Sequence, residues 1–191
     1  MERGSRGPSV AKLKVCPITR QEAASLVSKH HYLGDKPFRC SHAYGLFDGE
    51  IVGAIVFHGL SAPETAVGAF GLPRNEQHGL WEIGRLVLRP DYNGGNHGTR
   101  LLWGALRLLR EAEEVRAIIT YADSSLHSGG IYRAGNFKYY GLTASKKDFF
   151  VDGHIQERGK TKGVAGEWRD RSRKHRYLYV FDKTLEARWT A

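Results

Sequence analysis

The run from residue 81 to residue 123 constrains the fold of this chain more than any other. It begins with WEIGRLVLRP, which predicts a buried strand that ends at Pro90, because proline cannot continue strand pairing. A loop rich in glycine and asparagine follows, then LLWGALRLLREAEEV, which has the periodicity of an amphipathic helix, and then a second apolar strand, AIITYAD. Strand, loop, helix and strand in this order predict an α/β domain with a mixed sheet.

The remaining segments add a helix and a hairpin before this run and a strand after it. Thr19 can cap a helix over TRQEAASLVSKHHY, and Asp48-Gly49 separates two apolar runs as a hairpin turn does. The segment RYLYVFD predicts a final strand. Residues 61–79 are polar and rich in glycine, which predicts a long loop of the kind that carries binding functions. Residues 145–176 predict a basic loop or tail segment within the domain.

Length and charge bound the class of protein. A chain of 191 residues fits one domain over 1–191, with a frayed head at residues 1–10, which are rich in Gly, Ser, Pro and Arg. The 29 Lys and Arg against 20 Asp and Glu give a net charge of +9, which favours a polyanion or an anionic substrate. Two cysteines without framework spacing and the lack of an apolar run near the ~18 residues of a membrane span indicate a cytoplasmic protein without a membrane partner. The sequence leaves monomer and homodimer open.

The loop DYNGGNHGTR, residues 91–100, places backbone N–H groups at the start of a helix, where they can bind an anion. It resembles the pyrophosphate-binding loop of the GNAT acyltransferase superfamily, with Asn93 and Asn96 in place of the usual Gln or Arg and Gly. The resemblance implies a GNAT-like α/β (α+β) fold with a mostly antiparallel central sheet flanked by helices, and an acyl-CoA donor such as acetyl-CoA. The residues predicted to bind the donor are Leu88, Asn93, Gly94, Gly95, Asn96, Gly98 and Thr99.

The stretch from Tyr121 to Gly141 contains a second pattern of this superfamily. A short helix there bears Y-x-x-x-G-F, whose tyrosine often protonates the leaving thiolate. Tyr132 and Phe137 keep that spacing, and Asn136 occupies the glycine position. Asparagine tolerates the left-handed backbone conformation best after glycine, so the turn is predicted to persist. The alternative is that Tyr132 only packs beside Phe137.

An ordered set of segments between about residues 25 and 180 resembles the Mom family of phage DNA-modification proteins. The segments are His31-Tyr32, EIGRL at 82–86, Ala122-Asp123, GGIYRAGNF at 129–137 and KHRY at 174–177. The resemblance implies a transferase in the host cytoplasm that adds a carbamoylmethyl group to the 6-amino group of adenine in double-stranded DNA, which protects phage DNA from host restriction. The residues that it implies as catalytic are His31, Tyr32, Arg85, Asp123 and Tyr132.

The chemistry of adenine gives several of these residues a role. The amine is a weak nucleophile and is stacked inside the duplex, so an enzyme must extrude the base and hold it between aromatic or apolar walls. Tyr32, Tyr121 and Phe137 are candidate walls. Asp123 could orient the amine or accept its proton, or be a solvated loop residue. Tyr132 could act as a general acid or contact the donor.

Arg85 is unusual because its charge lies on a predicted buried strand. Such a charge requires a partner, for which Glu82, Asp123 and a phosphate are candidates, so an ion pair and a catalytic role stay open. His31 could act as a base or be an ordinary surface histidine. His31, Tyr32 and Asp123 could also hold iron, although no compact ligand motif occurs and the spacing predicts no metal site.

The segment at residues 154–176 contains eight Lys and Arg against three acidic residues. Basic residues interleaved with glycines and a tryptophan suit a loop along a phosphate backbone, with one side chain free to stack on a base. A solvated charged loop is the alternative. The residues predicted to bind nucleic acid are Lys160, Lys162, Trp168, Arg169, Arg171, Arg173, Lys174 and Arg176.

Three functions follow from these patterns. The first is a DNA adenine-modifying transferase. The second is a general GNAT N-acetyltransferase that acts on a protein, tRNA or small-molecule amine, which Asn93 and Asn96 disfavour. The third is a noncatalytic nucleic-acid-binding module, which the pairing of Asp123 with Tyr132 disfavours. Carbamoylmethyl is an alkyl substituent on nitrogen, so simple acyl transfer does not produce it.

Overall fold

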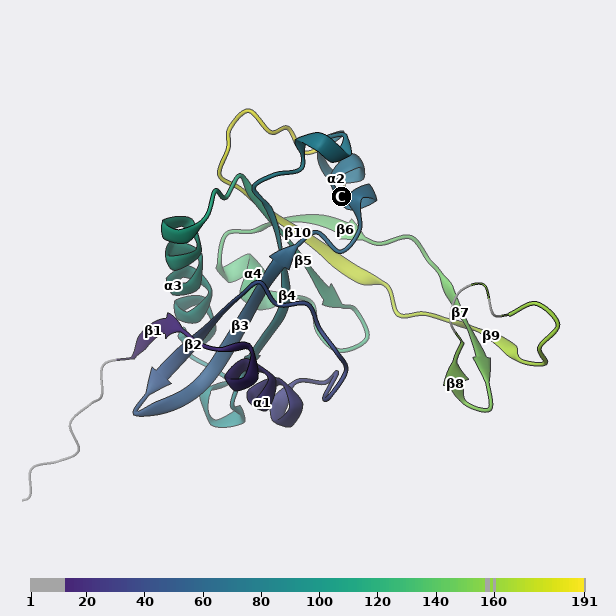
Figure 1. Cartoon of the computed structure of the whole chain (residues 1–191), viewed down its shortest axis with the longest axis horizontal. Coiled ribbons are helices and arrows are strands. Elements are labelled where there is room, and N and C mark those ends of the chain that lie inside the picture. The colour runs from purple at the N-terminus through teal and green to yellow at the C-terminus, as the bar shows by residue number, and fades with distance from the viewer. Residues whose placement is uncertain (1–12, 157–158, 160, 191) are drawn as a thin grey trace, which may run out of the picture.

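The computed structural model describes residues 13–156, 159 and 161–190 (Figure 1). The predicted head at 1–10 and Lys160 lie outside the described residues. The α-helices of the described ranges are α1 (Arg20–His30), α2 (Pro63–Phe70), α3 (His97–Ala112) and α4 (Gly130–Ala134). The strands are β1 (Lys14–Pro17), β2 (His42–Asp48), β3 (Glu50–Gly59), β4 (Leu80–Leu88), β5 (Ala117–Asp123), β6 (Lys138–Leu142), β7 (Lys147–Val151), β8 (His154–Ile155), β9 (Glu167–Asp170) and β10 (Lys174–Val180).

Two local predictions are confirmed by the backbone. Thr19 caps α1, because its hydroxyl accepts the Glu22 N–H at 3.2 Å and the Glu22 carboxylate accepts the Thr19 N–H at 2.7 Å. Gly49 has φ 72, which turns β2 back onto β3. The α1 helix and the first hairpin therefore begin where their sequences specify.

The central sheet has the strand order β1-β2-β3-β4-β5-β10-β6. Only β4 and β5 pair in parallel among these neighbours, and the others pair antiparallel. The predicted mixed and mostly antiparallel sheet is therefore confirmed. Ile118 and Ile119 of β5 belong to separate core clusters, because consecutive side chains of a strand point to opposite faces.

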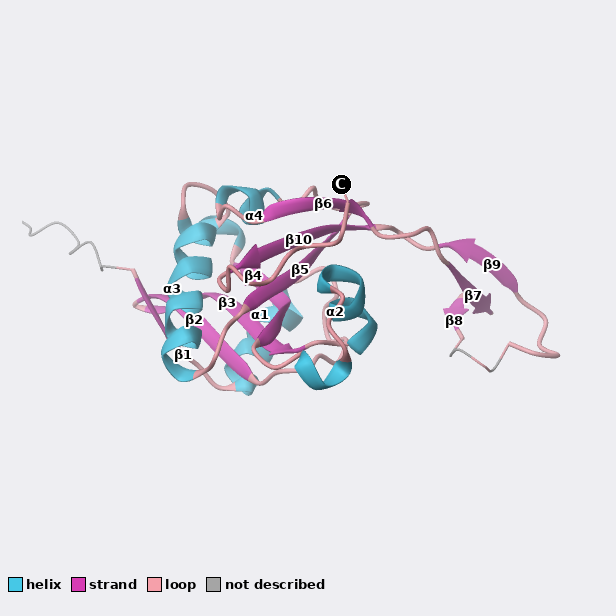
Figure 2. Cartoon of the chain, turned by 90° about the horizontal axis from the view of Figure 1, so that it is seen from above, coloured by secondary structure: helices cyan, strands magenta, loops and turns pink. Residues whose placement is uncertain are grey.

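Helices cover both faces of this sheet. The apolar side chains of α3 and Tyr132 of α4 belong to the Ile118 cluster. Phe70 of α2 belongs to the Ile119 cluster, and Val27 of α1 packs in a third cluster over β3 and β4. Figure 2 shows α3 on one side of the sheet and α1 and α2 on the other.

The sheet opens between β4 and β5. Their parallel pairing joins Leu80–Ile83 to Ala117–Thr120 and stops there. Beyond that point β4 continues along β3 to Leu88, and β5 continues along β10 to Asp123. The two strands therefore separate toward their carboxyl ends, which exposes the side chains between them.

Residues 61–79 are not a continuous loop, contrary to the sequence prediction. They contain α2, which starts with Pro63 in its first turn and ends at Gly71 with φ 71. Ala66, Ala69 and Phe70 are buried on one side of this helix. Proline at the start and a left-handed glycine at the end are ordinary helix boundaries, and they bracket an eight-residue helix here.

The 145–176 segment is also more ordered than predicted. Strands β8, β7 and β9 form a separate three-stranded antiparallel sheet. Figures 1 and 2 show it projecting from the core on two extended segments. Phe149 and Trp168 lie opposite each other, with ring centroids 5.1 Å apart, and this contact holds the small sheet together. We call residues 145–173 the arm.

Candidate active site

A cavity of about 230 Å³ lies where β4 and β5 separate. Its lining comes from the end of α1, from β4, from β5 and from the loop that leads into α4. It brings together four of the five predicted catalytic residues, with Tyr121 and His127 beside them; the four are His31, Tyr32, Arg85 and Tyr132. Residues that are distant in the sequence therefore meet at one opening in the sheet.

A β-bulge in β4 directs Arg85. The pairing of β3 with β4 shifts by one residue, which leaves Gly84 as the extra residue on β4. Gly84 has no room for a side chain, because a Cβ atom there would lie 2.5 Å from His58 Nε2. The bulge and the close packing of His58 together fix the position from which Arg85 enters the cavity.

Arg85 has no acidic partner among the described residues, so neither Glu82 nor Asp123, two of its three candidate partners, forms an ion pair with it there. One guanidinium nitrogen donates to the Gly84 carbonyl at 2.7 Å, and Cζ lies 5.5 Å from the centroid of the Phe38 ring. The Nε atom is buried without a partner. Burial lowers the pKa of Arg85, although the Tyr32 hydroxyl opposes this shift.

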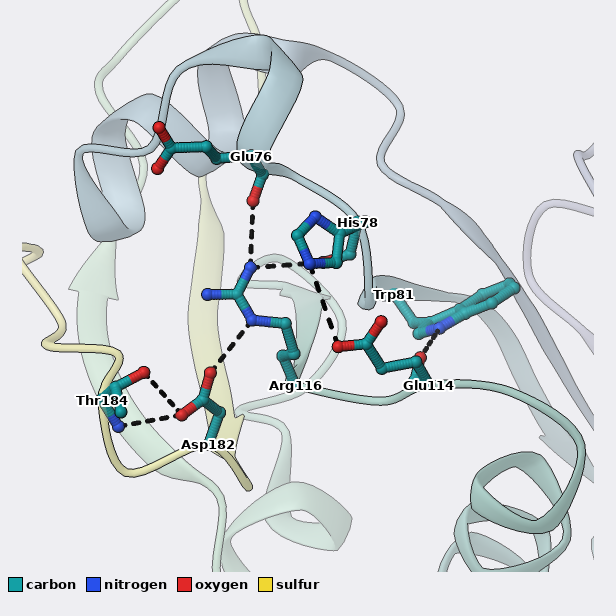
Figure 3. Close-up of polar contacts among 7 residues, drawn as sticks. All are labelled: Glu76, His78, Trp81, Glu114, Arg116, Asp182 and Thr184. Carbon is teal, nitrogen blue, oxygen red and sulfur yellow. Dashed lines mark hydrogen bonds and ion pairs between the residues drawn. The ribbon is translucent and has the colours of Figure 1, made fainter.

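Arg116 shows how the same chain satisfies a structural arginine (Figure 3). Its Nε donates to Asp182 at 3.0 Å, and its NH1 donates to the carbonyls of Glu76 at 3.0 Å and His78 at 3.5 Å. The side chain is 16% exposed and ties two loops to the start of β5. By comparison, no acidic side chain among the described residues pairs with the guanidinium of Arg85.

His31 and Tyr32 follow the last turn of α1, and their rings stack with centroids 4.4 Å apart. Desolvation, strengthened by the charges of Arg85 and His127, lowers the pKa of His31 to about 4, so its imidazole is neutral at pH 7. Its Nδ1 accepts the Leu33 N–H at 3.1 Å, which places the remaining proton on Nε2. His31 therefore offers a hydrogen-bond donor, and the general-base role stays a prediction that this tautomer does not favour.

Tyr132 lies on α4 and is 6% exposed. Burial raises its pKa to about 12, although the neighbouring Thr120 hydroxyl opposes this shift. Thr120 Oγ1 is buried and has no hydrogen-bond partner of good geometry among the described atoms. The phenol is therefore protonated at neutral pH, as a general acid must be. Asn136 has φ 60, so the predicted left-handed turn after α4 is confirmed.

Two of the three predicted aromatic walls line the cavity. Tyr32 is 49% exposed and Tyr121 is partly buried, and both belong to the lining. Burial raises the pKa of Tyr121 to about 12, so it too stays protonated. Phe137 is 3% exposed and packs with Tyr132 and Tyr179 in the core, so the prediction that it forms a wall is wrong.

Asp123 ends β5 just outside the cavity lining. Its Oδ1 accepts the N–H and the hydroxyl of Ser125 at 3.0 and 2.7 Å, and its Oδ2 accepts the Ser172 hydroxyl at 2.8 Å. Desolvation acts to raise the pKa of Asp123, but these hydrogen bonds outweigh it, so the pKa is lowered and the carboxylate is ionised. Asp123 thus joins the loop before α4 to the root of the arm. Its predicted contact with the substrate amine stays a prediction.

His127 is a cavity residue that the sequence analysis did not single out. It lies in the loop between Asp123 and Tyr132, and its ring meets Tyr32 edge-on with centroids 6.1 Å apart. Its main-chain N–H donates to the Asp123 carbonyl at 3.0 Å. A histidine between two predicted catalytic residues was the available signal, since a short loop between two site residues tends to stay near the site.

The loop before α3 fits a phosphate group. Asn96 precedes α3 without a side-chain cap, and the first turn contains no acidic residue. The Arg100 N–H is the first that bonds back into the helix, to the Asn96 carbonyl at 2.8 Å. The main-chain N–H groups that this leaves for an anion are those of His97, Gly98 and Thr99. Gly94 and Gly95 have φ 141 and 53, which their lack of a side chain permits.

This loop is joined to the cavity by Ile131. A Cβ atom on Gly98 would lie 2.5 Å from Ile131 Cδ1 and 3.6 Å from Leu88 Cδ1, so glycine lets α4 pack directly on the start of α3. Ile131 also lines the cavity. A coenzyme A-type donor with its diphosphate on the α3 N–H groups would therefore be held next to the cavity, where it would supply an activated group.

The basic residues predicted to bind nucleic acid differ in their surroundings. Lys162 and Trp168 are exposed on the arm, and Trp168 is 58% exposed. Arg169 pairs with Glu167, and Arg171 pairs with Asp148 at 3.2 Å. The arm therefore presents an exposed indole among basic side chains, some of which are partly neutralised.

The other predicted residues lie at the root of the arm or on the core. Arg173 donates to the Thr143 carbonyl at 2.7 Å, and Lys174 begins β10. Arg176 lies over Trp189, with Cζ 4.8 Å from the ring centroid, and its Nε is buried. Arg176 thus packs against the C-terminal segment.

No group of three or more His, Cys, Asp or Glu side chains within the described ranges is arranged to hold a metal ion. The iron hypothesis for His31, Tyr32 and Asp123 therefore has no structural support. None of the helices in these ranges combines the length and the apolar character that crossing a membrane requires.

Solved structures with a similar fold include three acetyltransferases. Arabidopsis thaliana NAA60 in complex with acetyl-CoA is 10% identical, with a TM-score of 0.57 over 90% of this chain and 99% of that chain. A Bacillus subtilis acetyltransferase in complex with CoA is 15% identical, with a TM-score of 0.54 over 89% and 99%. A GNAT-family acetyltransferase from Streptococcus pneumoniae is 10% identical, with a TM-score of 0.53 over 88% and 99%. The protein therefore has the GNAT fold.

Among proteins with this fold, the sequence matches one particular family. The Mom protein family model matches residues 12–191, so the chain belongs to the Mom family. No curated protein matches the sequence. The family resemblance and the GNAT fold expected from the sequence are both confirmed.

Proposed function

We propose that the protein is a transferase that attaches a carbamoylmethyl group to the 6-amino group of adenine in double-stranded DNA, and so protects phage DNA from host restriction. The observation that carries the proposal is the cavity, where His31, Tyr32, Arg85 and Tyr132 meet close to the root of a basic arm. Membership of the Mom family supports the same function.

The cavity suits an extruded purine base. The 6-amino group of a paired adenine is held in the stack, so the base must leave the duplex to react. A volume of about 230 Å³ accommodates one flat ring system, and Tyr32 and Tyr121 supply aromatic surfaces in the lining. Tyr32 is 49% exposed, so its ring is available for stacking on the base.

The proposed reaction needs a proton donor for the leaving group and a proton acceptor for the amine. The bond from the amine nitrogen to the CH2 carbon forms as the bond from that carbon to the leaving group of the donor breaks. Tyr132, whose pKa is raised to about 12, is protonated and donates to that leaving group. Asp123 is ionised at the end of β5 beside the cavity, and in this proposal it takes up the proton that the amine loses, in exchange for one of its serine hydrogen bonds. His31 donates from Nε2 and orients the base, because its Nδ1 is occupied by the Leu33 N–H.

The arm supplies the DNA contact in this proposal. Its exposed Lys162 suits a phosphate backbone, and its exposed Trp168 suits stacking on a base or wedging between bases. Ser172 at the root of the arm bonds to Asp123 beside the cavity, which supports a role of the arm in holding DNA near the cavity mouth.

Mass spectrometry of nucleosides tests the proposal. Plasmid DNA from bacteria that express the protein should contain a new deoxyadenosine derivative, and its mass should match carbamoylmethyl rather than acetyl. The Tyr132→Phe variant is the matched control, since it lacks one hydroxyl and should give unmodified DNA. Unmodified DNA from cells that contain soluble, folded wild-type protein would overturn the proposal.

A general N-acetyltransferase is the second candidate. The uncapped start of α3 favours it, because that loop suits the diphosphate of acetyl-CoA whatever the acceptor is. Incubation of the protein with radiolabelled acetyl-CoA and protein, tRNA or small amine acceptors tests this candidate. Label on any of these acceptors, with none on DNA, would replace the first proposal by the second.

A further inference from the structure

The charge in the cavity is one-sided. Arg85 carries a full positive charge, and the lining contains no aspartate or glutamate. The other polar side chains of the lining are two imidazoles and three phenols, and the His31 imidazole and the phenols of Tyr121 and Tyr132 are neutral at pH 7 and can donate hydrogen bonds.

The acids nearest in the sequence to cavity residues are occupied elsewhere. The Glu82 carboxylate accepts the Ser61 N–H at 3.1 Å and is not among the residues that line the cavity. Both oxygens of Asp123 accept hydrogen bonds from serines. Arg85 itself has the Gly84 carbonyl as its acceptor in the described structure, which is one acceptor for a group with five N–H donors.

The fold nevertheless fixes Arg85 in place. The bulge at Gly84, the contact of His58 with that glycine and the Phe38 ring under the guanidinium all restrict its position. A half-buried charge that is held rigidly and left without an acid is destabilising by itself. The arrangement becomes favourable when a ligand brings the negative charge.

We propose that the cavity contains a binding site for one oxyanion, a carboxylate or a phosphate, with Arg85 as its anchor and Tyr32 and His31 as neighbouring donors. The proposal rests on the proposed function, since it gives one group of the substrate a place in the same cavity. Two sources share this chemistry. One is a DNA phosphate next to the extruded adenine, and the other is a carboxylate on the molecule that supplies the transferred group.

Binding of simple anions tests the site without any modification reaction. Inorganic phosphate and acetate are titrated into the protein while the ring-proton NMR signals of His31 are followed, with His31→Gln used to assign them. A bound anion offsets the charge of Arg85, so the signals should shift and the pKa of His31 should rise toward its ordinary value. Arg85→Gln should lose this response, and Arg85→Lys should keep part of it because the charge remains.

Arg176→Gln is the matched control, because Arg176 also has a buried Nε without a partner but lies outside the cavity lining. It should respond to anions as the wild type does. Removal of the Arg85 guanidinium should weaken anion binding at least about tenfold, as expected for a charge-assisted hydrogen bond. No response in the wild type, or an unchanged response in Arg85→Gln, would overturn the proposal.

Nucleosides then separate the two sources. If the anion is a DNA phosphate, deoxyadenosine 5′- or 3′-monophosphate should bind more tightly than deoxyadenosine, and only when Arg85 is present. If the anion is a carboxylate, acetate should bind together with deoxyadenosine and the nucleotide phosphate should add nothing. Anion binding in a protein that leaves DNA unmodified would refute the proposed function alone, whereas modification by a protein that binds neither anion would refute this inference alone.

Discussion

Replacing Arg85 by methionine asks whether this arginine is held for a ligand or for the fold. Methionine keeps an unbranched apolar stem of similar length and removes the charge. We expect the free energy of unfolding to change by about 1 kcal/mol or less, because no acid among the described residues depends on Arg85. We expect DNA modification to be abolished at the same time.

The magnitude follows from three contributions that oppose one another. Removing the hydrogen bond to the Gly84 carbonyl costs about 1 kcal/mol, and removing the cation from the Phe38 ring costs about 0.5–1 kcal/mol. Removal of a half-buried charge without a partner returns about 1–3 kcal/mol. These contributions nearly cancel. An ion pair with Glu82 or Asp123 would instead have made the destabilisation about 3 kcal/mol or more.

Arg116→Met is the matched control. This substitution removes the donor from the carbonyls of Glu76 and His78, which alone costs about 2 kcal/mol, and it also leaves Asp182 without its arginine. Urea denaturation followed by circular dichroism measures both variants, and nucleoside mass spectrometry measures activity. A destabilisation of more than about 2 kcal/mol in Arg85→Met would refute the reasoning, since it would reveal a structural partner for Arg85.

Three further predictions concern the acid, the histidine and the arm. Tyr132→Phe should stay folded within about 1 kcal/mol of the wild type, because the neighbouring Thr120 hydroxyl has no hydrogen-bond partner of good geometry to lose, and it should lose modification; retained activity in the nucleoside assay would exclude the general-acid role. Wild-type stability should fall as pH drops from 6.5 to about 4, because the unfolded chain protonates His31 in this window and the folded protein does not. His31→Gln should remove the part of the decline that comes from His31. If urea denaturation gave the wild type and His31→Gln the same pH dependence between 6.5 and 4, the lowered pKa of His31 would be refuted. Neutralising Lys162 should lower the salt dependence of DNA binding by about 0.9 log unit per log unit of salt for each phosphate that the arm no longer neutralises, whereas Trp168→Ala should weaken binding by roughly 1–3 kcal/mol with the salt dependence unchanged. Fluorescence anisotropy with a labelled duplex measures both, and an unchanged slope in the lysine variant would exclude the arm as the element that binds phosphates.

Features that depend on a few neighbouring residues could be predicted from the sequence. The capping box at Thr19, the hairpin turn at Gly49 and the left-handed turn at Asn136 each involve residues within one short segment. The cavity residues could be predicted only as a family pattern. His31, Arg85 and Tyr132 come from three separate parts of the chain, and they meet at the opening that forms where β4 and β5 separate.

Features that depend on long-range pairing could not be predicted in the same way. The sequence predicts a polar loop for the arm because all residues of β9 are exposed and show no apolar alternation. Strand β9 is stabilised by its pairing with β7. The partner of Arg85 is a similar case. A charged side chain on a buried strand requires a partner, for which nearby acids are candidates, and only the fold shows that these acids bond elsewhere. The role of His127 likewise depends on how the loop after β5 folds back to the cavity.

The loop from Asp123 to Ile131 connects the three parts of the proposed function. At its start Asp123 accepts a hydrogen bond from Ser172 of the arm, in its middle His127 faces Tyr32 in the cavity, and at its end Ile131 packs on Gly98 at the start of α3. DNA contact, substrate and donor would therefore act on one short segment. Asp123 already uses both carboxylate oxygens to hold this segment together, so a substitution there changes the position of His127 as well as any proton transfer. Inactivity of an Asp123 variant consequently identifies a catalytic carboxylate only if Ser172→Ala, which removes the hydrogen bond from the arm to Asp123 and spares the carboxylate, keeps its activity.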